Sequence, residues 1–360
     1  MKGDPRRPLR QLFKQPSHSM KELEQNCGKV FKKKNFGLIV TNAHATHPGV
    51  WDAVTAFLQD ARGTIDFPVP RNFMDLFYGR YSNKFTGLHK DTQDIFAFVA
   101  LGKKRMLAWP FEYLLGKVKG IAPGDKYFNK RLPIDYRKFR KDAVVLDAQA
   151  GDMIYWPGDH WHVAEPVDKV FSCMLSLGVL RQELRSPGAG ESPLLRKFLS
   201  VNPHAGQREQ EALVSQEMTE VVPWEDAERQ LRWLSGYGFE QGGPMADAPK
   251  GKLKQPITVS RNPNGLVLWV RNKELKQLMV SSTGHVIALP EIPECVAMLE
   301  KLAAGKPFTV AEDPKRSVDG GKIIESYWSK DGEAKTRKLA SNRDLVSWLA
   351  QWLLRVGAAQ

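Results

Sequence analysis

Hydrophobic positions in the first half of the chain follow the spacing of short strands. Short runs rich in branched and aromatic residues are separated by Gly, Pro and Asp turns, which favours an antiparallel sandwich or barrel. The predicted strands are 36–40, 72–81, 94–101, 105–109, 143–148, 152–156 and 171–179. One helix interrupts this pattern, because Val50, Val54 and Leu58 recur at helical spacing after Pro48.

Changes of pattern and composition predict four regions. These are a basic N-terminal arm (1–35) with at most one helix, a β-rich core (36–182), a helical connector (183–250) and a C-terminal module (251–360). The boundaries fall where Pro, Gly and Ser accumulate, as is typical of linkers. We find no internal repeat.

The C-terminal module combines predicted strands with two predicted helices. Residues 265–272 and 276–283 form paired strands, and 294–305 forms a helix that ends at Gly305. The last helix begins at a cap, Ser341 or Asn342, and ends before a glycine at 357. The fold prediction is therefore a mainly β protein with α-helices, whose small α+β C-terminal module is winged-helix-like.

Composition excludes several classes of protein. Of the 360 residues, 42% are hydrophobic and 26% are charged, which excludes a mostly disordered chain. No apolar run reaches the roughly 18 residues of a membrane span, and the N-terminus lacks the apolar segment of a secretory signal. Three widely spaced cysteines indicate reduced thiols, so we predict a cytoplasmic protein without a membrane partner.

Positive charge collects at the two ends of the chain. The net charge is +13, of which residues 1–40 carry +7 and residues 251–360 carry +6, so the centre is neutral. Such a field favours an anionic partner, for example nucleic acid, a ribosomal partner or an acidic peptide. Solubility and a basic tail are the alternative explanation.

Trp348 and Trp352 are four residues apart and share one face of the predicted last helix. This face is either buried within the module or forms a homodimer contact.

Two stretches in the β-rich region carry the candidate chemistry. His89 and Asp91 are two residues apart, so on an extended strand their side chains point to the same side. A later stretch, Gly-Asp-x-x-Tyr-x-Pro over 151–157, leads from a strand through a turn to His160 and His162. Two histidines and one carboxylate are the facial triad of non-haem Fe(II) oxygenases, which leaves coordination positions open.

These motifs, in this order, resemble the JmjC-type, cupin-fold 2-oxoglutarate dioxygenases. The similarity covers roughly 70–182 and is greatest to the asparaginyl hydroxylase that inhibits hypoxia-inducible factor and to the bacterial ribosomal-protein oxygenases. It implies a double-stranded β-helix (jelly-roll or cupin) core and Fe(II) ligands His89, Asp91 and His162. His162 is preferred to His160 because it lies seven residues after Tyr155, as in the family.

The resemblance also implies residues that hold the cosubstrate. A basic residue fifteen positions after the first histidine, here Lys104, binds the distal carboxylate of 2-oxoglutarate. Its two basic neighbours point the other way on a strand. Thr86 occupies the position of a hydroxyl that shares this carboxylate, and an early-strand tyrosine, Tyr78 or Tyr81, contacts the cosubstrate; we select Tyr78.

The predicted function is an Fe(II)- and 2-oxoglutarate-dependent dioxygenase that uses O2, hydroxylates a C–H bond and releases succinate and CO2. A peptide or protein side chain is the preferred substrate, since the nearest relatives act on polypeptides. Alternatives are a hydroxylase of a small molecule or free amino acid and an N-methyl-lysine demethylase. The alternative outside enzymology is a cupin-like protein that binds RNA or peptide.

Overall fold

The chain folds into two compact units, which are defined here on a computed structural model. Unit 1 comprises 1–41 and 74–184, and unit 2 comprises 42–73 and 185–360. The structure describes residues 20–31, 36–64, 71–80, 87–165, 167, 171–180, 224–247, 256–263, 265–311, 313, 315, 317–328, 333–339 and 342–360. Most of the predicted arm and connector lies outside these residues. Among them, no helix has both the length and the apolar character of a membrane span.

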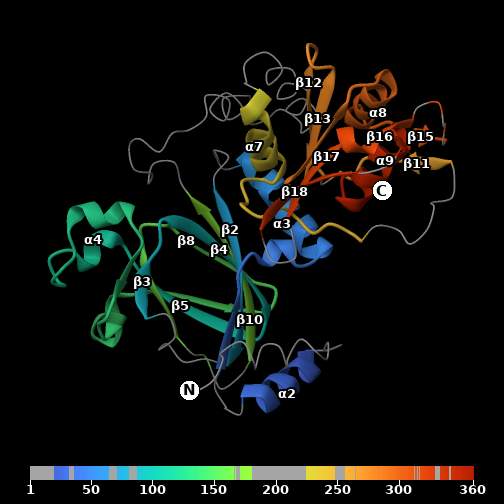
Figure 1. The fold of residues 1–360 in the computed structure, drawn as a ribbon. Helices are drawn as coiled ribbons and strands as arrows, with labels where there is room; N and C mark the ends of the chain where they lie inside the picture. Colours follow the sequence, from blue (N-terminus) through green and yellow to red (C-terminus); the bar gives the residue numbers. More distant parts are fainter. Residues whose placement is uncertain are drawn as a thin grey trace. The chain divides into compact units, whose positions relative to one another are not determined.

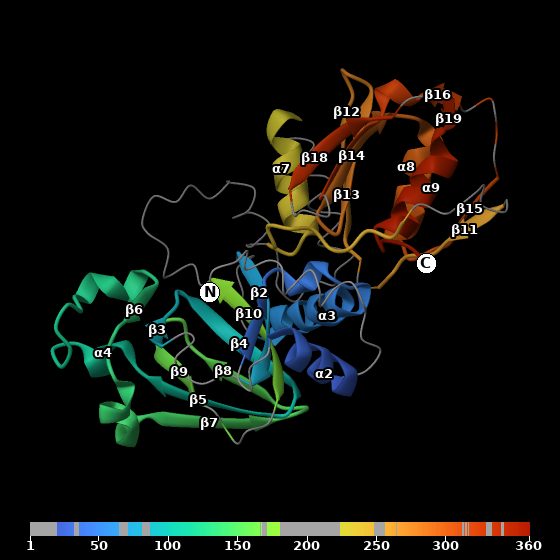
Figure 2. The same cartoon turned by 60° about the horizontal axis from the view of Figure 1, so that its bottom comes forward.

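Unit 1 is built on two five-stranded sheets (Figures 1 and 2). In order, the first contains β1 (Phe36–Val40), β2 (Asn72–Arg80), β10 (Ser172–Leu180), β4 (Gln93–Leu101) and β8 (Met153–Trp156). The second contains β6 (Lys130–Leu132), β3 (Leu88–Lys90), β9 (Trp161–Glu165), β5 (Lys103–Trp109) and β7 (Val144–Gln149). Neighbouring strands in the second sheet are antiparallel throughout.

The strand order confirms the predicted double-stranded β-helix. Between β3 and β10 the chain passes repeatedly from one sheet to the other, so that β3, β5 and β9 face β4, β8 and β10 across the barrel. The predicted strands are all present within one or two residues. Sequence analysis expected the His89 and Asp91 motif on a strand and a histidine after the next turn, but it gave no bounds for β3 and β9 and did not predict β6.

Both faces of the second sheet are covered. Its inner face packs on the first sheet, where Met106 and Ala148 meet Ile95, Ala97 and Val99 of β4. Its outer face packs on the segment between β5 and β7, residues 110–143, which contains α4 (Phe111–Leu114), β6 and two 3-10 turns. Trp109 is fully buried in this outer layer.

An N-terminal helix, α2 (Met20–Phe31), also belongs to unit 1. Its Cys27 is buried beside Tyr78, Phe171 and Cys173. The three cysteines are free thiols. Burial raises the pKa of Cys27 to about 11, so this thiol stays protonated and serves packing.

Unit 2 is a sheet with helices on both faces (Figure 2). The order of its antiparallel strands is β12 (Val267–Asn272), β13 (Gln277–Ser282), β14 (His285–Pro290), β17 (Ile324–Trp328) and β18 (Ala334–Lys338). Helices α8 (Pro293–Ala303) and α9 (Leu345–Arg355) pack on Leu278, Val280 and Ile287. On the other face, Ser281 of β13 bonds to Ser235, the last residue of α7 (Trp224–Ser235).

The remaining elements of unit 2 surround this sheet. Helix α3 (Pro48–Thr64) matches the predicted helix, although it clusters with unit 2 and not with the β-rich core in which the sequence analysis placed it. Two small pairs are formed by β11 (Ile257–Val259) with β15 (Phe308–Val310) and by β16 (Ser317–Asp319) with β19 (Asn342–Asp344).

Two expectations for the C-terminal module need comment. The cap of the last helix is Asp344, whose carboxylate accepts from the backbone N–H groups of Val346 and Ser347. Asn342, predicted as one of two caps, instead lies in β19, and residue 341 is outside the described part. The module is α+β as expected, but a winged-helix likeness is not confirmed, since its sheet has five strands.

Candidate metal centre

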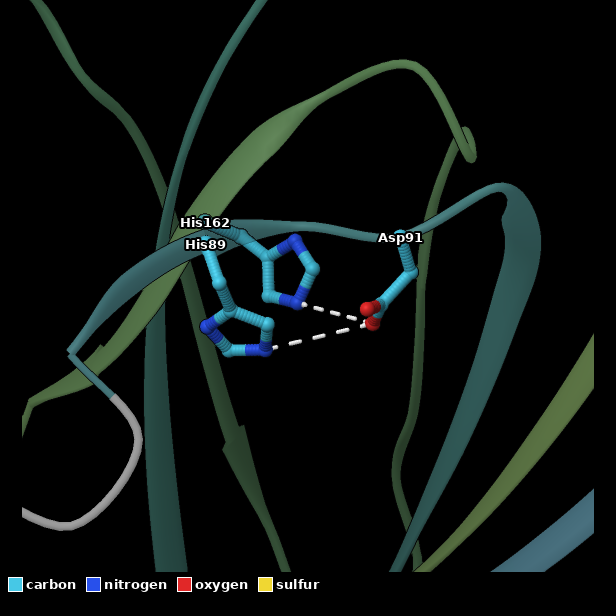
Figure 3. A group of neighbouring side chains, drawn as sticks. All are labelled: His89, Asp91 and His162. Carbon is cyan, nitrogen blue, oxygen red and sulfur yellow. Dashed lines mark ion pairs between the residues drawn. The ribbon is translucent and has the colours of Figure 1, made fainter. Parts of the chain in front are cut away.

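His89, Asp91 and His162 converge at one end of the barrel interior. His89 on β3 lies directly across from His162 on β9, and Asp91 follows β3 (Figure 3). One potential ligand atom from each residue lies within 4.8 Å of the others. The Nε2 atom of His162 lies 3.5 Å from Oδ2 of Asp91, and the Nε2 atom of His89 lies 3.9 Å from the same oxygen. Cross-strand register therefore brings together two histidines 73 positions apart in the sequence.

Backbone carbonyls orient both imidazole rings. Nδ1 of His89 lies 3.0 Å from the carbonyl oxygen of Gly87, and Nδ1 of His162 lies 3.1 Å from that of His160. A carbonyl only accepts, so each Nδ1 carries the proton and donates it. In each ring, Nε2 is the nitrogen directed toward Asp91. This is the tautomer and the supporting bond that metal-binding histidines need.

Electrostatics also favour a metal ion over protonated histidines. Burial, together with the neighbouring His89, lowers the pKa of His162 to about 4. The ring of His162 is therefore neutral near pH 7, as a ligand must be. Two neutral imidazoles and one carboxylate fit a divalent transition metal with open coordination positions. The donor set and its geometry thus fit the predicted Fe(II).

The structure distinguishes between the two candidate histidines of the last turn. Nδ1 of His160 lies 2.7 Å from the carboxylate of Asp159, and this carboxylate also pairs with Lys126. His160 is absent from the group of potential ligands found among the described residues. Cross-strand register favours His162, which lies directly opposite His89.

The turn that delivers His162 is fixed by Asp94. The buried carboxylate of Asp94 accepts from the backbone N–H of Gly158 at 2.8 Å. A Cβ atom at Gly158 would come within 2.7 Å of the backbone of Gln93 and Thr92. Only glycine therefore allows this close approach of the turn to β4.

Lys104 lies on the same face of the second sheet as the two histidines. Alternate residues of β5 share a face, and Ala108 of this strand lies opposite His162. Lys104 is four residues along β5 from Ala108, about 13 Å by strand geometry. Its side chain is only 4% exposed, and burial lowers its pKa to about 8. The predicted cosubstrate lysine is thus a buried cation inside the barrel.

Its basic neighbours point outward, as strand alternation predicts. Lys103 is exposed. Arg105 forms an ion pair with Asp147 on the neighbouring strand, at 2.6 Å. Neither side chain shares the face of the histidines, so Lys104 is the basic residue of this triplet that the barrel interior contains.

Tyr78 is also buried, and its hydroxyl lacks a hydrogen-bond partner among the described residues. Burial, together with the nearby Cys27, raises its pKa. Cys173 influences the pKa of both Tyr78 and Lys104, which indicates that the three polar groups lie in one region. An unpaired buried hydroxyl suits a hydrogen bond to a bound ligand. Thr86, the other predicted contact, lies outside the described residues.

Two residues near the site were missed by sequence reasoning. Lys90, between the first two candidate ligands, is fully buried and donates to the carbonyl oxygens of Lys126 and Phe128 at 3.0 and 2.8 Å. Burial lowers its pKa. Arg131 on β6 is exposed and lies directly across from His89. Strand β6 was not predicted, so nothing in the sequence placed Arg131 beside the motif.

Comparisons with known proteins give matches among solved structures. No protein-family model and no curated protein sequence matches the chain. The ribosomal oxygenase YcfD from Escherichia coli, in complex with cobalt and succinic acid, aligns at 15% identity with a TM-score of 0.39. The alignment covers 90% of this chain and 78% of that protein.

Two further matches each cover about a third of this chain. Hydroxypropylphosphonic acid epoxidase from S. wedmorenis aligns at 8% identity and a TM-score of 0.20, over 31% of this chain and 44% of the epoxidase. An RmlC-like cupin with a double-stranded β-helix fold from Methanocaldococcus jannaschii aligns at 6% identity and a TM-score of 0.20. This alignment covers 30% of this chain and 70% of the cupin. All these similarities are low, so the fold rests on the chain's own strand order and register.

Proposed function

We propose that the protein is an Fe(II)- and 2-oxoglutarate-dependent dioxygenase that hydroxylates a C–H bond. The observation that supports this most directly is the convergence of His89, Asp91 and His162, with both Nε2 atoms directed at the carboxylate. Fe(II) bound there, with 2-oxoglutarate and dioxygen, would supply the oxidising chemistry and release succinate and CO2.

The residues of the chain bind and orient the reactants. Lys104 pairs with the distal carboxylate of 2-oxoglutarate, and the unpaired hydroxyl of Tyr78 donates to the same region. The barrel interior between Lys104 and the histidines excludes water, because apolar residues such as Met106 and Ile154 line it. A buried lysine on the same face of the sheet as the two histidines suits an anionic ligand that extends from the metal centre.

We propose a peptide or protein side chain as the substrate. The side chains of His89 and Asp91 are 19% and 29% exposed, so the site is reachable from the surface. A side chain that projects from a polypeptide can enter such an open site without the whole substrate being enclosed. A closed pocket would instead suit a small molecule or a free amino acid.

The test is succinate release from 2-oxoglutarate by anaerobically prepared Fe(II) protein after exposure to air. We expect slow turnover without a prime substrate, loss of this turnover in His162→Ala, and retention in His160→Ala, the matched control. Equal turnover in both variants would exclude the proposed ligand set. Iron-loaded protein that shows no 2-oxoglutarate dependence in its charge-transfer band would exclude the cosubstrate.

The outcome on a peptide substrate separates hydroxylation from demethylation. Hydroxylation adds one oxygen atom to the peptide, whereas an N-methyl-lysine loses its methyl group as formaldehyde. Mass spectrometry of candidate ribosomal peptides, with a formaldehyde assay in parallel, distinguishes the two. We expect the added oxygen and no formaldehyde.

A further inference from the structure

The segment that covers the outer face of the second sheet is unusually basic. Residues 111–143 contain nine Lys or Arg and four Asp or Glu, a net charge of +5. The neutrality of the central region as a whole therefore conceals a basic surface in unit 1. In Figures 1 and 2 this segment, with α4 and β6, lies at the end of the barrel beside β3.

Part of this charge is compensated and part is available to a partner. Lys126, Lys130, Arg137 and Arg140 form ion pairs with carboxylates. The other basic residues are exposed, and no carboxylate pairs with them among the described residues; they are Lys117, Lys119, Arg131, Lys138 and Lys141. Five uncompensated cations on one short segment favour a polyanion.

Two large aromatic side chains are exposed within the same segment. Tyr127 is 47% and Phe128 57% exposed. Exposed aromatics between basic residues are the surface on which the bases of single strands stack while lysines and arginines contact the phosphates. An acidic peptide would satisfy the charges but would leave these ring faces without a partner.

Hydrogen bonds hold this aromatic pair beside the candidate metal centre. Lys90, the residue before Asp91, donates to the carbonyl oxygens of Lys126 and Phe128. The backbone N–H of Thr92 donates to Asn129 at 2.8 Å. On the sheet itself, exposed Arg131 lies directly across from His89. A ligand on this surface would therefore be positioned next to the site.

We propose that the surface formed by residues 117–141 binds single-stranded nucleic acid. The bases stack on Tyr127 and Phe128, and the five uncompensated basic side chains contact the phosphates. This binding site is separate from the oxygenase chemistry and requires neither the metal nor 2-oxoglutarate. It would allow the enzyme to find polypeptide substrates that are bound to nucleic acid.

The test is fluorescence anisotropy of the metal-free full-length protein with labelled oligonucleotides. RNA and DNA single strands of the same sequence distinguish the two nucleic acids, and binding of either one supports the proposal. Tyr127→Ala/Phe128→Ala should weaken binding roughly five-fold or more, with little change in the salt dependence. Lys138→Glu/Lys141→Glu should make the salt dependence weaker: the negative slope of log association constant against log salt concentration should become less steep by about 1.4. This is about 0.7 for each lost phosphate contact.

Controls separate this surface from the basic ends of the chain. Lys273→Glu/Lys306→Glu changes two exposed lysines of unit 2 by the same charge and should leave binding unchanged. Thermal melting by circular dichroism verifies that each variant is folded. The proposal is overturned if the unit 2 variant weakens binding as much as the Lys138/Lys141 variant, or if polyglutamate displaces the oligonucleotide at equal charge concentration. Because the assay omits iron, failure here leaves the succinate test unaffected.

Discussion

Two buried histidines, one in each unit, show how the same side chain serves chemistry or packing. Burial lowers the pKa of His162 in unit 1 and of His285 in unit 2, in both cases to about 4. His162 donates from Nδ1 to a carbonyl and directs Nε2 at Asp91. His285 uses Nε2 for a carbonyl, that of Gly243, and its buried Nδ1 has no partner among the described residues.

The difference shows that a low pKa does not by itself identify a functional site. What distinguishes His162 is the direction of the second nitrogen and the presence of other ligands there. The carboxylates follow the same rule: Asp91 lies between two imidazoles, whereas buried Glu325 in unit 2 forms ion pairs with Arg337 and Arg355. Unit 2 thus compensates a buried carboxylate with its own cations, whereas in unit 1 the carboxylate of Asp91 lies within reach of two potential metal ligands.

Removal of the central carboxylate should have the largest effect. Asp91→Ala leaves two neutral imidazoles, so we expect Fe(II) affinity to fall at least about 100-fold and succinate release to be lost. Asp159→Ala, beside His160, is the control and should keep Fe(II) affinity within a factor of a few. Isothermal titration calorimetry under nitrogen measures both. Tight iron binding by Asp91→Ala would show that the metal lies elsewhere.

Lys104→Met should weaken the cosubstrate and stabilise the fold. We expect KM for 2-oxoglutarate to rise roughly 10- to 100-fold, because a charged hydrogen bond is lost. We also expect the free energy of unfolding to increase by about 1–3 kcal/mol near pH 7, because a buried cation is removed. Lys103→Met, on the exposed face of the same strand, should change neither quantity.

Wild type and Lys104→Met should also differ in how the free energy of unfolding depends on pH. The pKa of Lys104 falls from 10.5 in the unfolded chain to about 8 in the fold. Between pH 8 and pH 10.5 the unfolded chain binds more protons than the folded chain. The free energy of unfolding of wild type therefore increases with pH, and the cost of burying the Lys104 cation disappears above pH 10.5. Urea titrations should therefore show a smaller difference in the free energy of unfolding between wild type and Lys104→Met at pH 10 than at pH 7.5. A constant difference would contradict the assigned burial.

His285→Gln should alter stability without affecting the metal. The pKa of His285 is about 4 in the fold, below its ordinary 6.5, so stability is lost as pH falls through this window. The amide of glutamine can donate to the carbonyl oxygen of Gly243 but does not titrate. Between pH 7 and pH 4 the free energy of unfolding should therefore fall by up to about 3 kcal/mol less in the variant than in wild type. Denaturant midpoints at the two pH values measure the difference, and unchanged Fe(II) affinity is expected.

The smallest effect should come from an exposed ion pair of the barrel. Arg105→Ala removes the partner of Asp147 on the outer side of β5. We expect a loss of less than about 1 kcal/mol in the free energy of unfolding and no change in KM for 2-oxoglutarate. A large rise in KM would mean that Arg105 and not Lys104 faces the cosubstrate.

The sequence predicted the longer strands, because five or more residues of alternating or apolar pattern carry a readable signal. It also predicted α3, whose apolar residues recur at helical spacing, and the end of α8 before Gly305. It gave no bounds for β3 and β9, which carry His89 and His162, and it missed β6, which carries Arg131, because the pairing of these short strands depends on their partners. The cap at Asp344 was missed because the segment before it pairs with β16.

By itself, the sequence determined the identity and order of the candidate ligands and the alternation that separates Lys104 from its neighbours. These properties are local, since covalent spacing and strand geometry fix them. Only the tertiary structure placed His162 and Arg131 directly across from His89 and oriented the Nε2 atoms. These depend on register between strands that are distant in the chain, which packing of the whole barrel determines.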